Sequence, residues 1–188
     1  MFVVGGFERV YEIGAVFRAE KSHTTRHLTE FTGVDFEMGF IKDHHDVMDL
    51  IEKMFHDLIK KLSHDAKTEL ATLNVTLPAM VKIPRMSVSE AKKLLLPLGK
   101  KYPENEDLDA EGERMLGELI KEKYHSEFVF VTEFPWAIKP FYHTKDEKNP
   151  KVTKSFDLLY NGVEICSGSQ REHRYDVWAA QAKEKGLD

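Results

Sequence analysis

Residues 156 to 174 read FDLLYNGVEICSGSQREHR, and the first half of this stretch decides the fold. Two apolar runs, Ser155 to Tyr160 and Val163 to Cys166, are separated only by Asn161-Gly162. This dipeptide accepts the positive φ angles of the tight turns that join antiparallel strands, so the stretch predicts a β-hairpin. A hairpin of this kind argues against a sheet built from parallel βαβ units.

Other segments have the period of a strand. Val10 to Phe17 and Val34 to Phe40 alternate apolar and polar residues, and Glu127 to Thr132 is a strongly apolar run. The first two flank the charged stretch FRAEKSHTTRHLTEF, residues 17 to 31. We therefore expect a long-looped antiparallel hairpin near the start of the sequence.

Helices are predicted between these strands by apolar residues at spacings of three and four and by capping residues. The serine and glutamate of Ser87-Val88-Ser89-Glu90 have the spacing of a capping box. The expected helices run from Asp43 to about Leu62, from Ser87 to near Gly99, through Met115 to about Tyr124, and from Asp176 to Lys185. The order of elements predicts an α+β fold in which an antiparallel β-sheet is flanked by helices.

Composition limits the class of protein. The chain has 188 residues, 41% of them hydrophobic, which is enough for one domain with a full core. The net charge of -5 excludes a generally basic nucleic-acid binder. The single cysteine, Cys166, excludes a disulfide framework, and no apolar run has the length of a membrane span. We expect a soluble cytoplasmic protein with no membrane partner.

Phosphate binding would depend on arginines, because neither of the two standard glycine-rich phosphate loops occurs in the sequence. In the charged stretch, Arg18 and Glu20 follow the expected strand, and Arg26 and His27 lie across the loop. Guanidinium groups match phosphate oxygens in pairs. A solvated loop whose charges pair with one another explains the same residues equally well.

A second polar cluster lies in and after the predicted hairpin. Asp157 and Glu164 can lie on one face of it, and with the Ser167 hydroxyl they offer the oxygen ligands that Mg²⁺ prefers. Small residues at 167–169 would leave room for a ligand beside Arg171. The alternative is an ordinary hairpin whose charges face water.

Two further groups of residues are weaker candidates for a functional site. The run Asp43-His44-His45-Asp46 has metal-binding residue types, but adjacent histidines on a helix should point in different directions. Cys166 would be a nucleophile only beside a base, and a lone cysteine in a strand is usually a small packed residue.

The two polar clusters together resemble a known family. FRAE, TTRHLTEF and VDFEM are similar to motif 2 of class II aminoacyl-tRNA synthetases. FDLLYNGVEICSGSQREHR resembles the late active-site segment of aspartyl-tRNA synthetases of the archaeal and eukaryotic type. Asparaginyl-tRNA synthetases usually carry an extra residue before the glutamate, and the related asparagine synthetase has Glu-Arg where this chain has Gln170-Arg171. The pattern is therefore nearer the aspartyl type.

The resemblance implies a role for each matching residue. Arg18 would contact both the ATP α-phosphate and the aspartate carboxylate, and ATP would also contact Glu20, Arg26, His27, Leu28 and Glu164. Mg²⁺ would be held by Glu164 and Ser167. Aspartate would also contact Asp157, Ser167 and Arg171. The implied function is that of an aspartate-tRNA ligase, which activates L-aspartate with ATP and transfers it to the 3′ end of tRNA.

The resemblance also implies partners and a domain plan. The implied partners are tRNA(Asp), with tRNA(Asn) left open, and a second subunit in a homodimer. The whole chain would be part of one catalytic domain, with a motif 2 hairpin over 10–40, a connecting helical region over 43–125, late active-site strands over 127–171 and a terminal helix over 175–186. The family's anticodon-binding barrel, motif 1 and motif 3 have no counterpart in this sequence, so we expect the middle of a catalytic domain. Two alternatives remain, a non-catalytic module that binds tRNA, ATP or a synthetase subunit, and an asparagine synthetase-like enzyme.

Overall fold

The computed structural model describes residues 1–19 and 28–187, which fall into two compact units, Met1–Lys42 and Asp43–Asp188. The first unit is built on the expected hairpin. Strand β1 (Arg9–Phe17) pairs antiparallel with β2 (Glu30–Met38), in a register that sets Arg9 opposite Met38 and Phe17 opposite Glu30. The second strand begins four residues before the predicted Val34, because the pairing continues along the chain toward Arg18.

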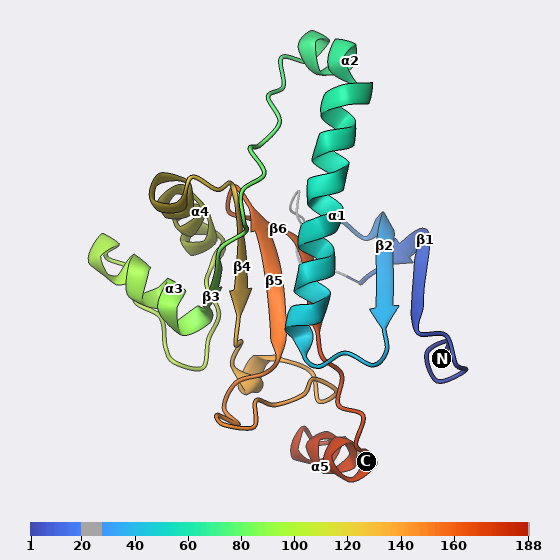
Figure 1. The fold of residues 1–188 in the computed structure, drawn as a ribbon. Coiled ribbons are helices and arrows are strands. Elements are labelled where there is room, and N and C mark those ends of the chain that lie inside the picture. Colours follow the sequence, from blue (N-terminus) through green and yellow to red (C-terminus); the bar gives the residue numbers. More distant parts are fainter. Residues whose placement is uncertain (20–27, 188) are drawn as a thin grey trace. The chain divides into compact units, whose positions relative to one another are not determined.

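The second unit contains a four-stranded sheet, visible in Figure 1, with the order β3, β4, β5, β6. The strands are β3 (Arg85–Ser87), β4 (Phe128–Thr132), β5 (Ser155–Tyr160) and β6 (Val163–Ser169). The pairs β4–β5 and β5–β6 are antiparallel, which confirms the predicted α+β class. Strand β3, which runs parallel to β4, was not predicted, since three residues are too few to show a period.

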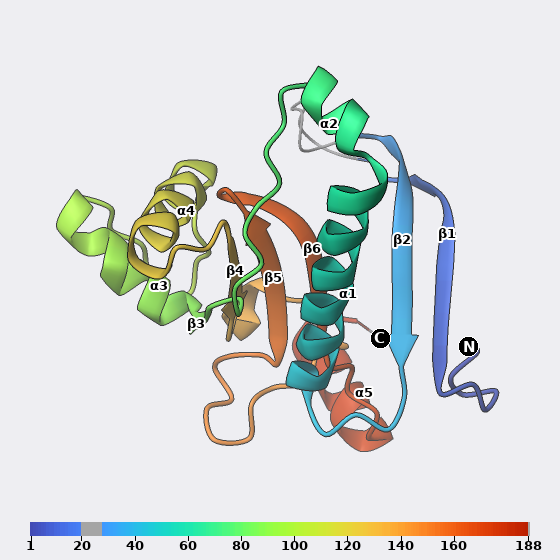
Figure 2. The same cartoon turned by 45° about the horizontal axis from the view of Figure 1, so that its top comes forward.

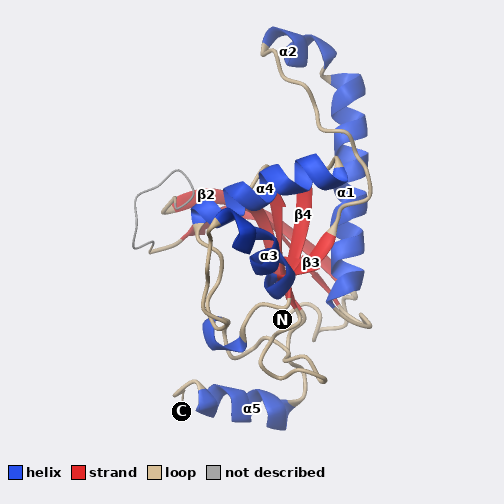
Figure 3. Ribbon diagram, turned by 90° about the vertical axis from the view of Figure 1, so that its left-hand side faces the viewer, coloured by secondary structure: helices blue, strands red, loops and turns tan. Residues whose placement is uncertain are grey.

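One face of this sheet is covered by the first half of helix α1 (His44–Asp65). Asp43 caps the helix as predicted, because its carboxylate accepts a hydrogen bond from the His45 backbone N–H at 2.7 Å. Phe55 of the helix packs on Phe128 of β4, with ring centroids 5.5 Å apart. The rest of α1 and the short helix α2 (Lys67–Thr72) extend past the sheet (Figure 3).

The opposite face packs on helices α3 (Val88–Leu95) and α4 (Ala110–Tyr124), as Figure 2 shows. Leu95, Leu116 and Ile120 from these helices form one core with Val129 and Leu159 from the sheet. The predicted capping box is present, with Ser87 accepting from the Glu90 backbone and Glu90 from the Ser87 backbone. A single 3-10 turn, η1 (Leu96–Leu98), then ends the first of these helices at Gly99.

The connection between β4 and β5 crosses the end of the sheet and carries a 3-10 turn, η2 (Trp136–Ile138). Helix α5 (Tyr175–Glu184) follows β6 and lies beyond this connection (Figure 3). No helix in the described part of the chain is both long and apolar enough to cross a membrane.

Candidate active site

A β-bulge decides which side chains meet on β6. Leu158 pairs with Cys166 and Leu159 pairs with Glu164, so Ile165 has no partner across the strands. In a regular strand, Glu164 and Ser167 would point to opposite faces, because they are three positions apart. The extra residue shifts the alternation and puts Glu164, Ser167 and Asp157 on one face of the hairpin.

Asp157 is the buried member of this group, with a side chain opposite Ser167. Burial raises the pKa of the Asp157 carboxyl to about 7, and the nearby carboxylates of Glu164, Asp107 and Glu113 act in the same direction. The ammonium group of Lys139 opposes this rise, from 3.6 Å away. The site therefore combines several acidic groups with one nearby cation.

Lys139 comes directly after η2, and its side chain reaches Asp157 on the interior strand β5. Its Nζ lies 3.8 Å from the centroid of the Phe134 ring, and its side chain is 17% exposed. An ammonium group held against an aromatic face and a carboxylate has lost much of its water. Such a group can pair with an anionic ligand at a lower desolvation cost than a surface lysine can.

Arg171 lies at the end of β6, where the chain turns toward α5. It forms an isolated antiparallel bridge with His143, and its guanidinium carbon is 5.3 Å from the centroid of the Tyr142 ring. The pKa of His143 is lowered to about 4, first by burial and then by the charges of Lys139 and Arg171. Both cations therefore lie near the same buried histidine.

All of the predicted ATP-binding residues except Glu164 belong to the first unit. The backbone N–H of Arg18 donates to the Thr29 carbonyl at 2.9 Å, and its guanidinium carbon is 5.5 Å from the centroid of the Phe31 ring. Leu28 is exposed. The other three predicted residues, Glu20, Arg26 and His27, lie outside the described residues.

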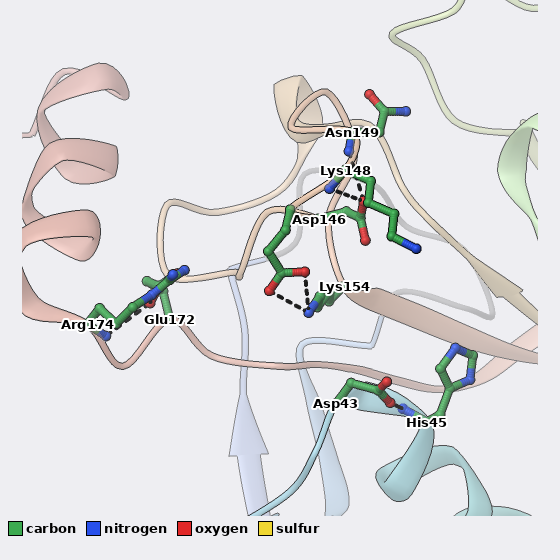
Figure 4. Close-up of polar contacts among 9 residues, drawn as sticks. Asp43, His45, Asp146, Lys148, Asn149, Lys154, Glu172 and Arg174 are labelled. Carbon is green, nitrogen blue, oxygen red and sulfur yellow. Dashed lines mark hydrogen bonds and ion pairs between the residues drawn. The ribbon is translucent and has the colours of Figure 1, made fainter.

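The histidines at the start of α1 converge more than expected. The rings of His44 and His45 are 4.4 Å apart at an angle of 35°, so the expectation that they point in different directions was wrong. Their ligand atoms and that of Asp43 lie within 4.8 Å of one another. Asp43 already caps the helix (Figure 4), and Arg85 Nη1 lies 3.3 Å from His45 Nδ1. The helix cap and the guanidinium group therefore already engage two of these three side chains.

Comparison with known proteins assigns the fold to a family. The family described as tRNA synthetases class II (D, K and N) matches residues 1–188. The chain belongs to this family of class II tRNA synthetases. The resemblance seen in the two polar clusters is thus confirmed over the whole sequence.

Relatives of known function and structure agree with this assignment. An aspartate–tRNA(Asp/Asn) ligase of Aeropyrum pernix is 44% identical over 189 residues, which cover 99% of this chain and 43% of the relative. An aspartate–tRNA(Asp) ligase of Pyrococcus abyssi is also 44% identical, over 100% of this chain and 43% of the relative. The aspartyl tRNA synthetase of Entamoeba histolytica superimposes with a TM-score of 0.95 at 36% identity, over 100% of this chain and 39% of that one. This class II synthetase chain therefore spans less than half the length of the relatives it matches.

Sequence reasoning did not find Lys139 and Tyr142, which lie beside two of the candidate site residues. Both lie in FPWAIKPFYH, which has no strand or helix period and no catalytic motif. Their position beside Asp157 and Arg171 depends on a connection that folds back across the sheet. The only available signal was the clustering of aromatic and basic residues in an irregular segment.

Proposed function

We propose that this chain is part of an aspartate-tRNA ligase. In this reaction L-aspartate and ATP form aspartyl-adenylate and pyrophosphate, and the aspartyl group then passes to the 3′ end of tRNA(Asp). The observation that carries the proposal is the shared face of Asp157, Glu164 and Ser167 with two cations nearby: Lys139 lies 3.6 Å from Asp157, and Arg171 acts on the same buried His143 as Lys139 does. The names of the relatives support the same assignment.

The amino acid is proposed to bind by charge. Arg171, with Lys139 beside it, would pair with the side-chain carboxylate of aspartate, and Asp157 would accept from its ammonium group. Ser167 lies opposite Asp157 and would donate to the substrate from the same face. A neutral amide would leave one of the two cations without a counter-charge, so asparagine should bind more weakly.

Glu164 and Ser167 are the proposed Mg²⁺ residues. Their donor atoms are oxygens, which suit this ion, and the bulge at Ile165 puts them on one face. Mg²⁺ bound there would neutralise charge on the phosphate oxygens of ATP. Glu164 would also lie beside the nucleotide.

The remaining ATP contacts are proposed on the hairpin of the first unit. Arg18 would contact the α-phosphate and the aspartate α-carboxylate, and Glu20, Arg26, His27 and Leu28 would contact the nucleotide. These assignments rest on the match to motif 2. The position of Arg18, one residue beyond β1, agrees with a side chain presented at the end of a rigid strand pair.

The chemistry requires positioning and charge neutralisation more than a covalent nucleophile. The α-carboxylate oxygen of aspartate attacks the α-phosphorus of ATP, a new P–O bond forms, and the bond to pyrophosphate breaks. A hydroxyl group at the tRNA 3′ end then attacks the aspartyl carbonyl, and AMP leaves. Fixed cations that face the developing negative charge accelerate such a step.

The proposal extends to the whole protein. One catalytic domain would include the segments 10–40, 43–125, 127–171 and 175–186. The complete enzyme would be a cytoplasmic homodimer. The cytoplasmic location is supported by the single cysteine, which suits a reducing compartment. Since one relative is named for tRNA(Asp) and another for both tRNA(Asp) and tRNA(Asn), charging of each tRNA should be measured separately.

The test is ATP–pyrophosphate exchange by this chain. We expect exchange that requires L-aspartate. Absence of exchange together with retained binding of tRNA or ATP would favour the non-catalytic binding module. Formation of free asparagine from aspartate, ATP and ammonia, without tRNA, would favour an asparagine synthetase-like enzyme.

Arg171→Ala should identify the specificity contact within the same assay. Loss of a charge-assisted pair should raise the aspartate concentration for half-maximal exchange by roughly 10- to 100-fold, with little effect on the value for ATP. Arg114→Ala is the matched control, because Arg114 forms an exposed pair with Glu118 on α4. An unchanged aspartate requirement in the Arg171 variant would refute the specificity assignment.

A further inference from the structure

Arg171 is exposed at the end of a strand, yet it is held from one side by the segment 136–145, which we call the strap. The Tyr142 ring faces its guanidinium group at 5.3 Å. The backbone N–H of Glu172 donates to the Tyr142 carbonyl at 2.8 Å, and His143 bridges to Arg171. The strap therefore supports both the backbone and the side chain of Arg171.

The other side of Arg171 is fixed by its neighbours in sequence. The Glu172 carboxylate is buried and accepts from Arg174 Nε at 2.8 Å, Arg174 Nη2 at 2.7 Å and the Arg174 backbone N–H at 3.0 Å. Figure 4 shows this pair at the turn that leads into α5. The bonded pair of Glu172 and Arg174, which follows Arg171 in the chain, limits how far the Arg171 backbone can rotate.

Helix α5 in turn holds the strap. Gln181 is 3% exposed, and its Nε2 donates to the carbonyls of Phe141 at 2.6 Å and His143 at 3.1 Å. These two carbonyls flank Tyr142. One amide group on α5 therefore fixes the residue that faces the arginine.

The same helix holds the start of the strap. Lys185, which caps α5, donates from Nζ to the carbonyls of Trp136 at 2.7 Å and Ala137 at 3.0 Å. The Trp136 indole N–H donates to Glu184 at 2.8 Å. Lys139 follows two residues after Ala137, so α5 anchors the strap on both sides of this lysine.

We propose that Tyr142 and Gln181 are positioning residues that preorganise Arg171 for the side-chain carboxylate of aspartate, an inference that rests on the proposed function. A free arginine has many rotamers, and binding an anion in a bidentate pair would freeze them. An aromatic face that already orients the guanidinium plane removes most of this entropy cost before the substrate arrives. The expected result is tighter binding of a planar carboxylate with no gain for ATP.

The experiment measures L-aspartate and ATP binding to the chain by calorimetry. Tyr142→Leu should weaken L-aspartate binding by roughly 3- to 30-fold and leave ATP binding within about twofold. Tyr142→Phe retains the ring and should restore the affinity. Gln181→Met removes the amide donor at similar volume and should weaken L-aspartate in the same direction. Tyr175→Leu, an exposed tyrosine on α5, is the matched control.

A second measurement reads the position of Arg171 without any ligand. The Nε–Hε NMR signal of Arg171, assigned by its loss in Arg171→Lys, should be shifted by the ring current of Tyr142. Tyr142→Leu should abolish the shift, and Tyr142→Phe should retain it. Because this readout concerns one side chain, a general loss of folding would be recognised by the collapse of all other signals.

The outcomes separate the two proposals. If the parent chain binds L-aspartate but Tyr142→Leu binds it equally well, the positioning role is refuted and the proposed function stands. If the parent chain does not bind L-aspartate, the proposed function fails, and the role of Tyr142 toward aspartate fails with it. Equal weakening of ATP and L-aspartate would indicate a structural role and would also refute the inference.

Discussion

At the scale of the residue, the site depends on a carboxyl group that the fold makes difficult to ionise. Asp157 lies in the core-facing side of the sheet with Val129, Val131 and Leu159 as neighbours along the ladder. Burial raises its pKa, and one lysine supplies partial compensation. A substrate ammonium group would add the missing positive charge, which is a reason to keep such a costly residue.

The raised pKa makes a prediction about stability and pH. Asp157 has a pKa of about 7 in the folded chain against 3.8 without the fold, so the folded state binds the extra proton between these values. The free energy of unfolding should therefore fall as pH rises from about 4 to 7, by at most about 4 kcal/mol from this group. Asp157→Asn should be more stable than the parent at pH 8 and nearly equal at pH 4.

Urea denaturation of both proteins at the two pH values measures this difference. Glu122→Gln, which changes an exposed carboxyl on α4, serves as the control for removing a charge. Parallel stability curves for the parent and Asp157→Asn would show that Asp157 ionises normally in the fold.

At the scale of the element, the backbone of helix α4 at Gly117 directly meets the turn of the β5–β6 hairpin at Asn161 and Gly162. A Cβ atom on Gly117 would lie 2.5 Å from the Gly162 backbone nitrogen and 2.9 Å from the Asn161 carbonyl carbon. Gly162 has a φ of +76°, as the turn requires. The turn that the sequence predicted is thus also a packing surface for the helix.

Gly117→Ala should therefore destabilise the chain although alanine favours helices. Rigid backbone atoms cannot move aside, so overpacking should cost about 1–3 kcal/mol, more than the gain of about 1 kcal/mol in helix propensity. Thermal unfolding followed by circular dichroism measures the change. Glu122→Ala, on an exposed position of the same helix, should leave the midpoint nearly unchanged.

The elements were largely predictable, because their signals are local. Asp43 and the Ser87–Glu90 pair fixed two helix starts, and Asn161-Gly162 fixed the hairpin. The face shared by Asp157 and Glu164 was predicted, but the bulge that produces it was not, since nothing in VEICS identifies the unpaired residue. Lys139 and Tyr142 could not be predicted as neighbours of the site, because they contact Asp157 and Arg171, which belong to a later part of the chain.

At the scale of the whole molecule, the two units differ in how they are stabilised. Every buried hydrophobic residue described lies in the second unit, from Met48 onward. The β1–β2 hairpin of the first unit has two strands, and its face of Tyr11, Ile13 and Phe17 is exposed. Isolated two-stranded hairpins are marginally stable in water.

A fragment of residues 43–188 should therefore fold without residues 1–42. We expect cooperative unfolding with a midpoint within a few degrees of that of the parent, because none of the buried hydrophobic residues described above is removed. Scanning calorimetry of the fragment and the parent measures this. A broad, non-cooperative transition in the fragment would show that the hairpin unit contributes to the stability of the second unit.

The bulge in β6 has a consequence for substitutions at Ile165. Ile165 is the extra residue of the bulge, and it is 43% exposed. Replacing Ile165 with another strand-forming residue should therefore leave the face of Glu164 and Ser167 unchanged. A regular strand shorter by one residue would place these two side chains two positions apart and on the same face, so the bulge accommodates one extra residue without turning either side chain away.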